Sequence, residues 1–356
     1  MRSILTAGHS TNGTMVHMER FPLGFNTYSV RALRWNDLQL LEYAAGQKLD
    51  AVYLQDSIDP GNNDPAHWKE LKDAAARLGL VLHGGDAGAM PQNSDGLEAT
   101  SKRLREGIRH AVGIGSKLVR FRAAGDRASL PPGPVEKTMD TMVRVLRGVR
   151  SEAIDAGVKI AIENHKDLFC WQTRRVIDGA GKEFVGSYLD TGNPVFVMED
   201  PLETVETLGP VAVMLHLRDS VVYEAHNGIA VQWVPLGEGV VDFKNIVAKA
   251  REVCPPIAIY NKPITGRPAQ LLPIYDVEFM KKWRDMKAAD LARFMALAKR
   301  GHPYEGPMVI EDLQGRKAAK TPPAFAAALA YQQREHMERG LDYARKALDL
   351  GVKWRA

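Results

Sequence analysis

The feature that most constrains this chain is a repeated alternation of short apolar runs with longer amphipathic segments. Short runs rich in Val, Ile and Leu predict buried strands, and segments with apolar residues at helical spacing predict helices. Repeated strand–helix units predict a parallel sheet covered by helices. Eight strands are predicted: Leu23–Val30, Ala51–Gln55, Leu80–Gly84, Lys117–Ala123, Lys159–Asn164, Val185–Asp190, Val213–Arg218 and Ile257–Asn261.

Several residues mark where the intervening helices begin. Asn36 is suited to cap the first helix, and Asp64 followed by Pro65 is a typical start for the second. The third and fourth helices are predicted to be long, at roughly Asp95–Gly113 and Pro134–Ala156. Eight strand–helix units without a glycine-rich dinucleotide turn after the first strand favour a closed (β/α)8 TIM barrel over an open doubly wound sheet.

The barrel does not account for the whole chain. We expect residues 1–20 to form an N-terminal extension, residues 21–300 to form the catalytic barrel, and residues 301–356 to form a loop and a long helix. Pro322 and Pro323 open that helix, whose apolar residues recur at helical spacing. It is therefore expected to pack on the barrel or on a partner.

Charge and composition exclude several classes of protein. The chain has 47 Lys and Arg against 43 Asp and Glu, a net charge of +4, which argues against nucleic-acid binding driven by charge. No apolar run approaches the ~18 residues of a membrane span, so no membrane association is expected. Cys170 and Cys254 cannot build a disulfide framework or a cysteine zinc site, and the setting is expected to be cytoplasmic.

Polar residues follow three of the predicted strands at matching positions. Glu163, Asp190 and His216 each end an apolar run, at separations of 27 residues (163 to 190) and 26 residues (190 to 216). Active sites of TIM barrels lie at the carboxyl ends of the strands, where consecutive units place these groups side by side. Two carboxylates and an imidazole suit a divalent ion. Alternatively, the carboxylates cap the following helices and His216 is an interior histidine.

Four segments around these residues carry a family resemblance: IENHKDLF, LDTGNPVFVMEDPLETVETL, HLRDS and PLGEGVVDF. They resemble the sugar phosphate isomerase/epimerase family of the xylose isomerase-like barrel superfamily, over residues 20–300 and most specifically over 163–242. The resemblance implies a metal ion held by Glu163, Asp190 and His216, usually with a glutamate on the last strand. Mn²⁺ is the first expectation, with Co²⁺, Mg²⁺ or Zn²⁺ as alternatives. It also implies proton abstraction next to a sugar carbonyl.

The sequence departs from that family pattern on the last strand. Lys262 stands where relatives have the glutamate, and a protonated lysine has no lone pair for a metal. In one interpretation three ligands still hold a metal, and Glu163, His165 and Lys262 are the catalytic groups, with His165 or Lys262 moving the proton. In the other, Lys262 takes the place of the ion, pairs with Glu163 and Asp190, and leaves a metal-free protein.

Four further residues are predicted to contact a substrate. His83 lies near the end of the third strand and either holds a substrate hydroxyl group or has a structural role. Arg120 and Arg122 share one face of the fourth strand and offer planar donors to a hydroxylated or anionic substrate, unless they form buried ion pairs. Glu238, in the loop PLGEGVVD, either faces the site or is a solvated loop residue.

These observations favour an enzyme that acts on a sugar, a polyol or an oxidised glycoside as an isomerase or epimerase. A lyase of the same family is the alternative: an inosose dehydratase, or the large subunit of a C-glycoside deglycosidase that acts on 3-oxo-glycosides with a small companion subunit. A metal-free sugar-binding descendant is a second class. An AP-endonuclease-like nuclease is a third, although the strand ends supply few ligands for several metals. A homo-oligomer is expected.

Overall fold

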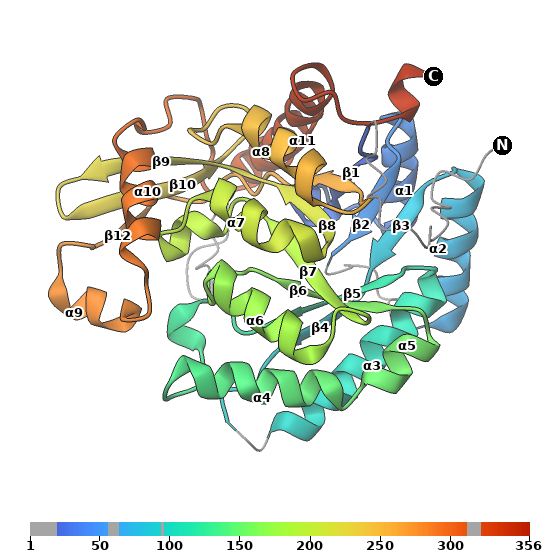
Figure 1. Cartoon of the computed structure of the whole chain (residues 1–356). Coiled ribbons are helices and arrows are strands. Elements are labelled where there is room, and N and C mark those ends of the chain that lie inside the picture. Colours follow the sequence, from blue (N-terminus) through green and yellow to red (C-terminus); the bar gives the residue numbers. More distant parts are fainter. Residues whose placement is uncertain (1–19, 56–63, 94–95, 312–321) are drawn as a thin grey trace.

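The structure is a computed structural model that describes residues 20–55, 64–93, 96–311 and 322–356. Residues 1–19 of the predicted N-terminal extension lie outside the described residues. Helices surround a central parallel sheet, and a smaller sheet extends from one end of it (Figure 1).

The central sheet is the predicted barrel. Its strand order is β3-β2-β1-β11-β8-β7-β6-β5-β4, with every pairing parallel. β3 and β4 stand at the two ends of this strand order, but only Gly85 separates them in the chain. They are therefore two halves of one strand, and the sheet closes as a barrel of eight strands. Gly85 has φ 102°, a backbone conformation that glycine tolerates best, and its carbonyl accepts from the Arg120 amide at 2.8 Å. The TIM-barrel prediction is confirmed. The strands are β1 Leu23–Asn26, β2 Ala51–Leu54, β3 Val81–Gly84, β4 Asp86–Ala89, β5 Leu118–Arg122, β6 Lys159–Glu163, β7 Val185–Asp190, β8 Ala212–Leu217 and β11 Ile259–Asn261.

The helices begin largely where their capping residues predict. Asn36 accepts from the Gln39 amide at 2.9 Å, and Gln39 accepts in return from the Asn36 amide at 3.0 Å. Asp64 accepts from the Ala66 amide at 2.9 Å. The helices of the barrel are α1 Asp37–Gly46, α2 Pro65–Arg77, α3 Leu97–Ile114, α4 Val135–Arg147, α5 Arg150–Asp155, α6 Cys170–Ala180, α7 Pro201–Leu208 and α8 Phe243–Val253.

Two predicted elements differ from the structure. The first strand ends at Asn26 rather than Val30, because the Asn26 side chain accepts from the Tyr28 amide and caps a 3-10 helix at Thr27–Leu33. The fourth helix is two helices, α4 and α5, because Val149 has a non-helical φ of −126° and ψ of 18°. Local caps and breaks of this kind override helical or strand periodicity.

A second sheet lies outside the barrel and was not predicted. It contains β9 Asp219–Ala225, β10 Gly228–Val234 and β12 Gln270–Leu272, all antiparallel, and stands with α9 Val277–Met280 and α10 Ala288–Ala298 at the left of Figure 1. Because β9 follows β8 after a single residue, this sheet extends from the carboxyl end of the barrel. It has an apolar core of its own, which includes Val222, Ile229, Val231, Leu272, Phe294 and Leu297.

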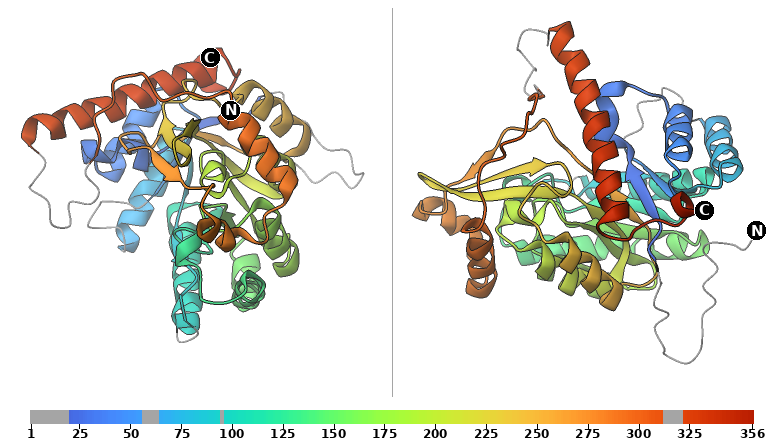
Figure 2. Two further views of the ribbon diagram at one scale, coloured as in Figure 1. Left: turned by 90° about the vertical axis from the view of Figure 1, so that its left-hand side faces the viewer. Right: turned by 90° about the horizontal axis from the view of Figure 1, so that it is seen from above.

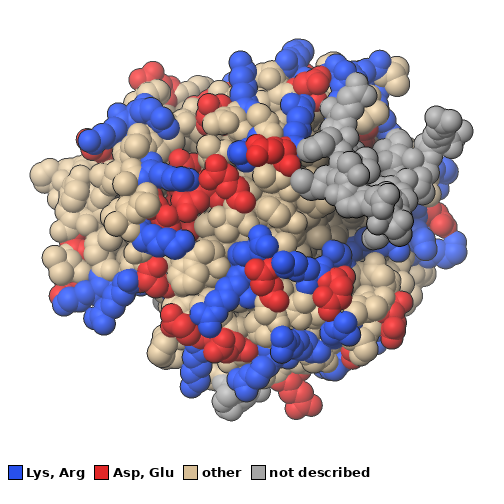
Figure 3. Space-filling model, in the orientation of Figure 1, with Lys and Arg blue, Asp and Glu red and all other residues tan. Residues whose placement is uncertain are grey.

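The long C-terminal helix is α11, Pro323–Lys346, and lies outside the barrel as predicted. It contacts the 3-10 helix Thr27–Leu33 and β11, and Figure 2 shows it along the outside of the barrel. Met337, Leu341 and Ala344 on this helix are buried in the core of the barrel. Across the described residues no helix is both long and apolar enough to cross a membrane. On the face shown in Figure 3, Lys and Arg are interspersed with Asp and Glu.

Alternation along the strands gives the inside of the barrel two layers. Residues two apart point the same way, so an apolar residue is followed by a charged or polar one nearer the carboxyl end. The pairs are Leu118 and Arg120, Ala161 and Glu163, Tyr188 and Asp190, Met214 and His216, and Tyr260 and Lys262. The apolar layer fills the barrel, and the charged layer forms the floor of the site.

Candidate active site

Lys262 occupies the centre of the charged layer. Its ammonium Nζ lies 3.2 Å from Glu163 Oε1, 3.2 Å from Asp190 Oδ2 and 2.7 Å from the Tyr188 hydroxyl. The side chain is 1% exposed. An ammonium group has three donors, and these three acceptors use all of them.

Two arginines complete the ion pairs of the floor. Arg120 Nε donates to Glu163 Oε2 at 2.6 Å, and the same guanidinium pairs with Asp86. Arg218 pairs with Asp190. Burial raises the pKa of Glu163, but Arg120 and Lys262 outweigh it and hold that pKa well below its usual range. The floor therefore places three basic side chains, Arg120, Arg218 and Lys262, against three carboxylates, Asp86, Glu163 and Asp190, so that its formal charges are equal in number.

His216 lies beneath this network between aromatic rings. Its ring centroid is 4.3 Å from that of Tyr188 and 4.8 Å from that of Tyr260. Burial and the neighbouring Lys262 lower the pKa of His216 well below its ordinary value, so the ring is neutral. Its Nε2 is 3.5 Å from the Asn26 side-chain nitrogen, and its buried Nδ1 has no hydrogen-bond partner.

The residues present do not fit a divalent metal ion. The Lys262 ammonium lies between the carboxylates of Glu163 and Asp190, and the His216 ring packs against Tyr188 and Tyr260. Within the described part of the chain no group of three or more His, Cys, Asp and Glu is arranged to hold a metal. An ion would have to displace a buried ammonium that makes three hydrogen bonds. The geometry matches the interpretation in which Lys262 takes the place of the ion.

A cavity of about 690 Å³ opens above the floor. It brings together four of the predicted site residues, Arg120, Arg122, His165 and Lys262. One wall comes from the small sheet, through Trp233 on β10. The other lining residues are Tyr28, Gln55, Lys166, Phe196, Arg218, Ile264, Arg267, Pro268, Ala269 and Gln270.

His165 is the imidazole of this cavity. It follows β6, two residues past Glu163, and its buried Nδ1 has no hydrogen-bond partner. Burial lowers the pKa of His165 well below its ordinary value; Glu163 opposes this shift, while Arg120 and Arg122 add to it. The ring is therefore neutral near pH 7 and has a nitrogen free to accept a proton.

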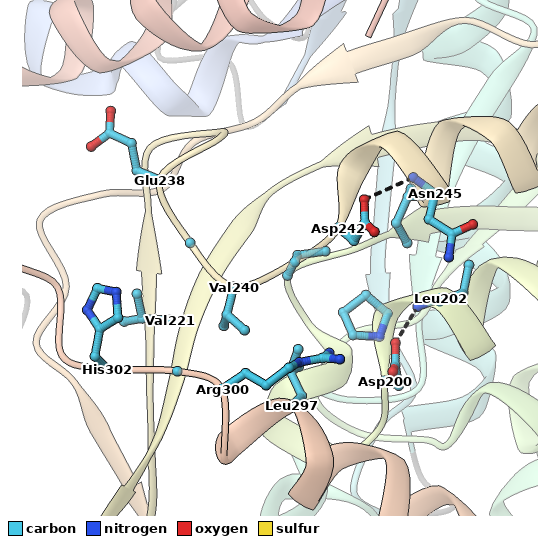
Figure 4. Close-up of a pocket in the computed structure, with 15 residues that line it drawn as sticks. Asp200, Leu202, Val221, Glu238, Val240, Asp242, Asn245, Leu297, Arg300 and His302 are labelled. Atoms are coloured by element: carbon cyan, nitrogen blue, oxygen red, sulfur yellow. Dashed lines mark hydrogen bonds between the residues drawn. The ribbon is translucent and has the colours of Figure 1, made fainter. Parts of the chain in front are cut away.

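Two predicted substrate contacts lie elsewhere. His83 Nδ1 is 2.5 Å from the Tyr260 hydroxyl inside the barrel, and burial lowers its pKa to about 4. Glu238 accepts from the Tyr304 hydroxyl at 2.6 Å, pairs with Arg339 at 2.8 Å and lines a different cavity, of about 530 Å³. Figure 4 shows Glu238 well away from Asp200 in that second cavity. A loop residue has no strand alternation to fix the direction of its side chain, so the sequence could not show which cavity Glu238 lines.

Three basic residues that line the 690 Å³ cavity, Lys166, Arg218 and Arg267, were not predicted from the sequence. A signal for Arg218 existed, because it lies two residues past His216 and strand alternation points both the same way. Lys166 and Arg267 lie in loops after β6 and β11, where no periodic signal is available.

Comparison with known proteins supports the barrel fold. The family model described as xylose isomerase-like TIM barrel matches residues 41–253. The chain belongs to this family. An uncharacterised protein of Escherichia coli, YihM, is 21% identical over 238 residues, 65% of this chain and 68% of that protein. The 3-oxo-isoapionate decarboxylase of Pectobacterium atrosepticum is 25% identical over 182 residues, which cover half of this chain and 60% of that enzyme.

Solved structures of other proteins have a similar fold. The IolI protein, described with a bound zinc atom, is 16% identical with a TM-score of 0.56, and the match covers 77% of this chain and 99% of IolI. A D-psicose 3-epimerase described in the presence of D-fructose is 14% identical with a TM-score of 0.58, over 92% of this chain and 99% of that one. At these identities the likeness shows the fold alone.

Proposed function

We propose that this protein is an enzyme that removes a proton next to the carbonyl group of a sugar or an oxidised sugar, as an isomerase or a lyase. The observation that carries the proposal is the imidazole of His165, which lines a cavity at the carboxyl end of the barrel and whose buried Nδ1 has no hydrogen-bond partner. Membership of the xylose isomerase-like family supports it. So do the names of relatives, which include an epimerase of a ketose and a decarboxylase of an oxo compound.

His165 is proposed as the base. When the C–H bond next to the carbonyl breaks, the proton passes to the free nitrogen of the ring, and the electron pair moves to the carbonyl oxygen to give an enolate. A neutral imidazole can accept this proton without first losing one of its own.

The Arg218 guanidinium is proposed to stabilise the enolate oxygen. Its buried Nε atom has no hydrogen-bond partner. Asp190 forms an ion pair with the Arg218 guanidinium. The Cζ atom of Arg218 lies 4.3 Å from the centre of the Trp233 ring. A fixed positive group aimed at developing negative charge is among the strongest contributions to catalysis.

Lys262 and Glu163 are proposed as positioning residues. The three hydrogen bonds of Lys262 hold Glu163 and Asp190 together, and these in turn orient Arg120 and Arg218. The expected Mn²⁺ does not enter the proposal, because the donor set does not fit it. We therefore expect turnover without an added divalent ion.

The fate of the enolate separates the two enzyme classes. Return of a proton to a carbon gives an isomerase or epimerase, whereas departure of a group from the adjacent carbon gives a lyase. A binding protein without turnover is the second candidate, favoured by the complete pairing of the charges in the floor.

The test is hydrogen exchange in D₂O with a panel of ketoses, inososes and 3-oxo-glycosides, followed by NMR. We expect deuterium at the carbon next to the carbonyl of at least one compound, with and without a chelator. His165→Asn should slow the exchange by about 10²–10⁴-fold. His226→Asn, at an exposed position in the small sheet, should leave it unchanged.

Two results would contradict the proposal. Binding of panel sugars without any exchange would indicate the binding protein instead. Full exchange by His165→Asn would show that another group is the base.

A further inference from the structure

Basic side chains outnumber acidic ones among the residues that line the 690 Å³ cavity. The formal charges of the floor are equal in number, but Arg122, Lys166 and Arg267 also line the cavity, and no Asp or Glu stands among the described lining residues. Arg267 has one acidic partner, Glu311, at 3.7 Å, and shares it with Arg31. Within the described residues, Arg122 and Lys166 form no ion pair and no hydrogen bond to a side chain.

The position of Lys166 is defined by aromatic rings. Its Nζ lies 5.4 Å from the centre of the Phe196 ring and 5.6 Å from that of Trp233. Arg218 lies over the same Trp233 ring. Burial and the positive charge of Arg218 lower the pKa of Lys166, as expected for a cation crowded by other cations.

The two carboxylates that oppose this shift in the pKa of Lys166, Asp126 and Asp167, are hydrogen-bonded to backbone amides. Asp167 accepts from the Ala124 and Leu168 amides, both at 2.7 Å, and burial raises its pKa to about 7. Asp126 accepts from the Ser129 amide at 2.9 Å and caps a short 3-10 helix. Both groups are committed to backbone amides, and neither lines the cavity.

We infer that the substrate carries an anionic group, a carboxylate or a phosphate, and that Arg122, Lys166 and Arg267 bind it. The inference rests on the proposed function and narrows the substrate to an acidic sugar or a sugar phosphate. Arginine and lysine are the side chains that bind such oxygens best, through charge-assisted hydrogen bonds. An anion held there places the rest of the sugar beside His165 and Arg218, which line the same cavity.

The first experiment uses the anions themselves. Thermal unfolding of the full chain is followed with orthophosphate, malonate or chloride at constant ionic strength. We expect phosphate or malonate to raise the midpoint above that in chloride, and the stronger of the two identifies the group. Lys166→Met should weaken the apparent affinity about tenfold or more, the loss of one charge-assisted contact.

Lys287→Met is the matched control. Lys287 also lies over a tryptophan ring, with its Nζ 5.6 Å from the centre of Trp171, but it does not line the cavity. It should retain the response of the wild type. No rise with either anion, or an equal rise in Lys166→Met, would overturn the inference.

The second experiment separates this inference from the proposed function. D-fructose, D-fructuronate and D-fructose 6-phosphate share one ketone and differ in the terminal group, and binding and hydrogen exchange are measured for each. Preferential binding of an anionic ketose, lost in Lys166→Met, supports the anion site even where no exchange occurs, and that result counts against the enzyme. Equal binding and exchange with D-fructose would overturn the anion site and leave the enzyme standing.

Discussion

At the residue scale, the side chain that decides the chemistry of the floor is Lys262. A buried ammonium between two carboxylates is stable only when every donor and acceptor is satisfied, and here Glu163, Asp190 and Tyr188 provide this. Removing one partner from a buried ion network leaves charge uncompensated and costs more than an exposed pair contributes.

We therefore predict that Lys262→Met destabilises the protein by about 3–5 kcal/mol, measured by urea unfolding. Lys182→Met removes an exposed lysine that pairs with Asp178 at 3.1 Å, and it should cost less than about 1 kcal/mol. Lys262→Glu should also be unstable by itself but gain stability from Mn²⁺ or Zn²⁺, because it adds a third carboxylate beside His216. Stabilisation of the wild type by these ions would contradict the proposed role of Lys262.

Glu199 is a second residue whose environment has a measurable consequence. Burial raises its pKa to about 8, while its bonds from Cys170 oppose the shift and Glu203 and Asp290 add to it. The folded chain thus keeps Glu199 protonated above the ordinary glutamate pKa near 4.5. Protonated Glu199 therefore contributes to the free energy of unfolding. This contribution is complete below pH 4.5 and is lost as the pH rises to about 8.

Glu199→Gln cannot titrate, so it should lose less stability than the wild type between pH 5 and pH 8. The difference should reach up to about 4 kcal/mol at 1.4 kcal/mol per pH unit, measured by urea unfolding at both pH values. Exposed Glu136→Gln should follow the wild type. Parallel pH dependence of Glu199→Gln and the wild type would show that Glu199 is ionised when folded.

At the scale of elements, the C-terminal helix α11 contacts β11, the strand that Lys262 directly follows. Asn261, the last residue of β11, donates to the Met337 carbonyl at 3.1 Å. A Cβ added at Gly340 would lie 2.6 Å from the Asn261 side-chain nitrogen, so this close approach requires glycine. The helix thereby contacts the residue next to Lys262.

Gly340→Ala should destabilise the protein by about 1–3 kcal/mol, because the new methyl group displaces a buried, hydrogen-bonded amide. Gly46→Ala, at the end of α1, meets nothing within 4 Å and should be neutral or stabilising by up to about 1 kcal/mol. Thermal unfolding of the two variants measures the contrast. Equal midpoints would show that α11 tolerates a wider separation from β11.

At the scale of the whole molecule, one carboxylate joins segments near the two ends of the described chain. Buried Asp50 accepts from the Leu23 amide at 2.9 Å, from Val352 at 2.9 Å and from Lys353 at 3.0 Å. The Gly351 amide donates to the Phe21 carbonyl at 2.9 Å. The C-terminal segment is thus bonded to the first strand of the barrel.

Asp50→Ala leaves three amides without their acceptor and should cost about 3 kcal/mol or more. Limited proteolysis should then cut near residues 350–356 before it cuts the barrel. Asp73→Ala, which removes an exposed partner of Lys69, should leave both stability and cleavage unchanged. A wild-type cleavage pattern in Asp50→Ala would show that packing alone holds the C-terminal segment.

The sequence alone predicted the barrel and placed Glu163, Asp190 and His216 at the carboxyl ends of three strands that pair in the structure. These follow from local periodicity, because strand alternation sets the direction of each side chain and parallel strands align their carboxyl ends. The same reasoning identified Lys262 as the departure from the family pattern. It left open whether a metal or the lysine lies between the carboxylates.

The position of the Lys262 ammonium between Glu163 and Asp190 comes from the tertiary structure, since it depends on distances among side chains of β6, β7 and the loop after β11. The tertiary structure also shows which cavity each loop residue lines. Loop residues Lys166 and Arg267 meet in the cavity, while Glu238, predicted there, lies elsewhere. The direction of a loop side chain is set by long-range contacts, and local sequence does not contain them.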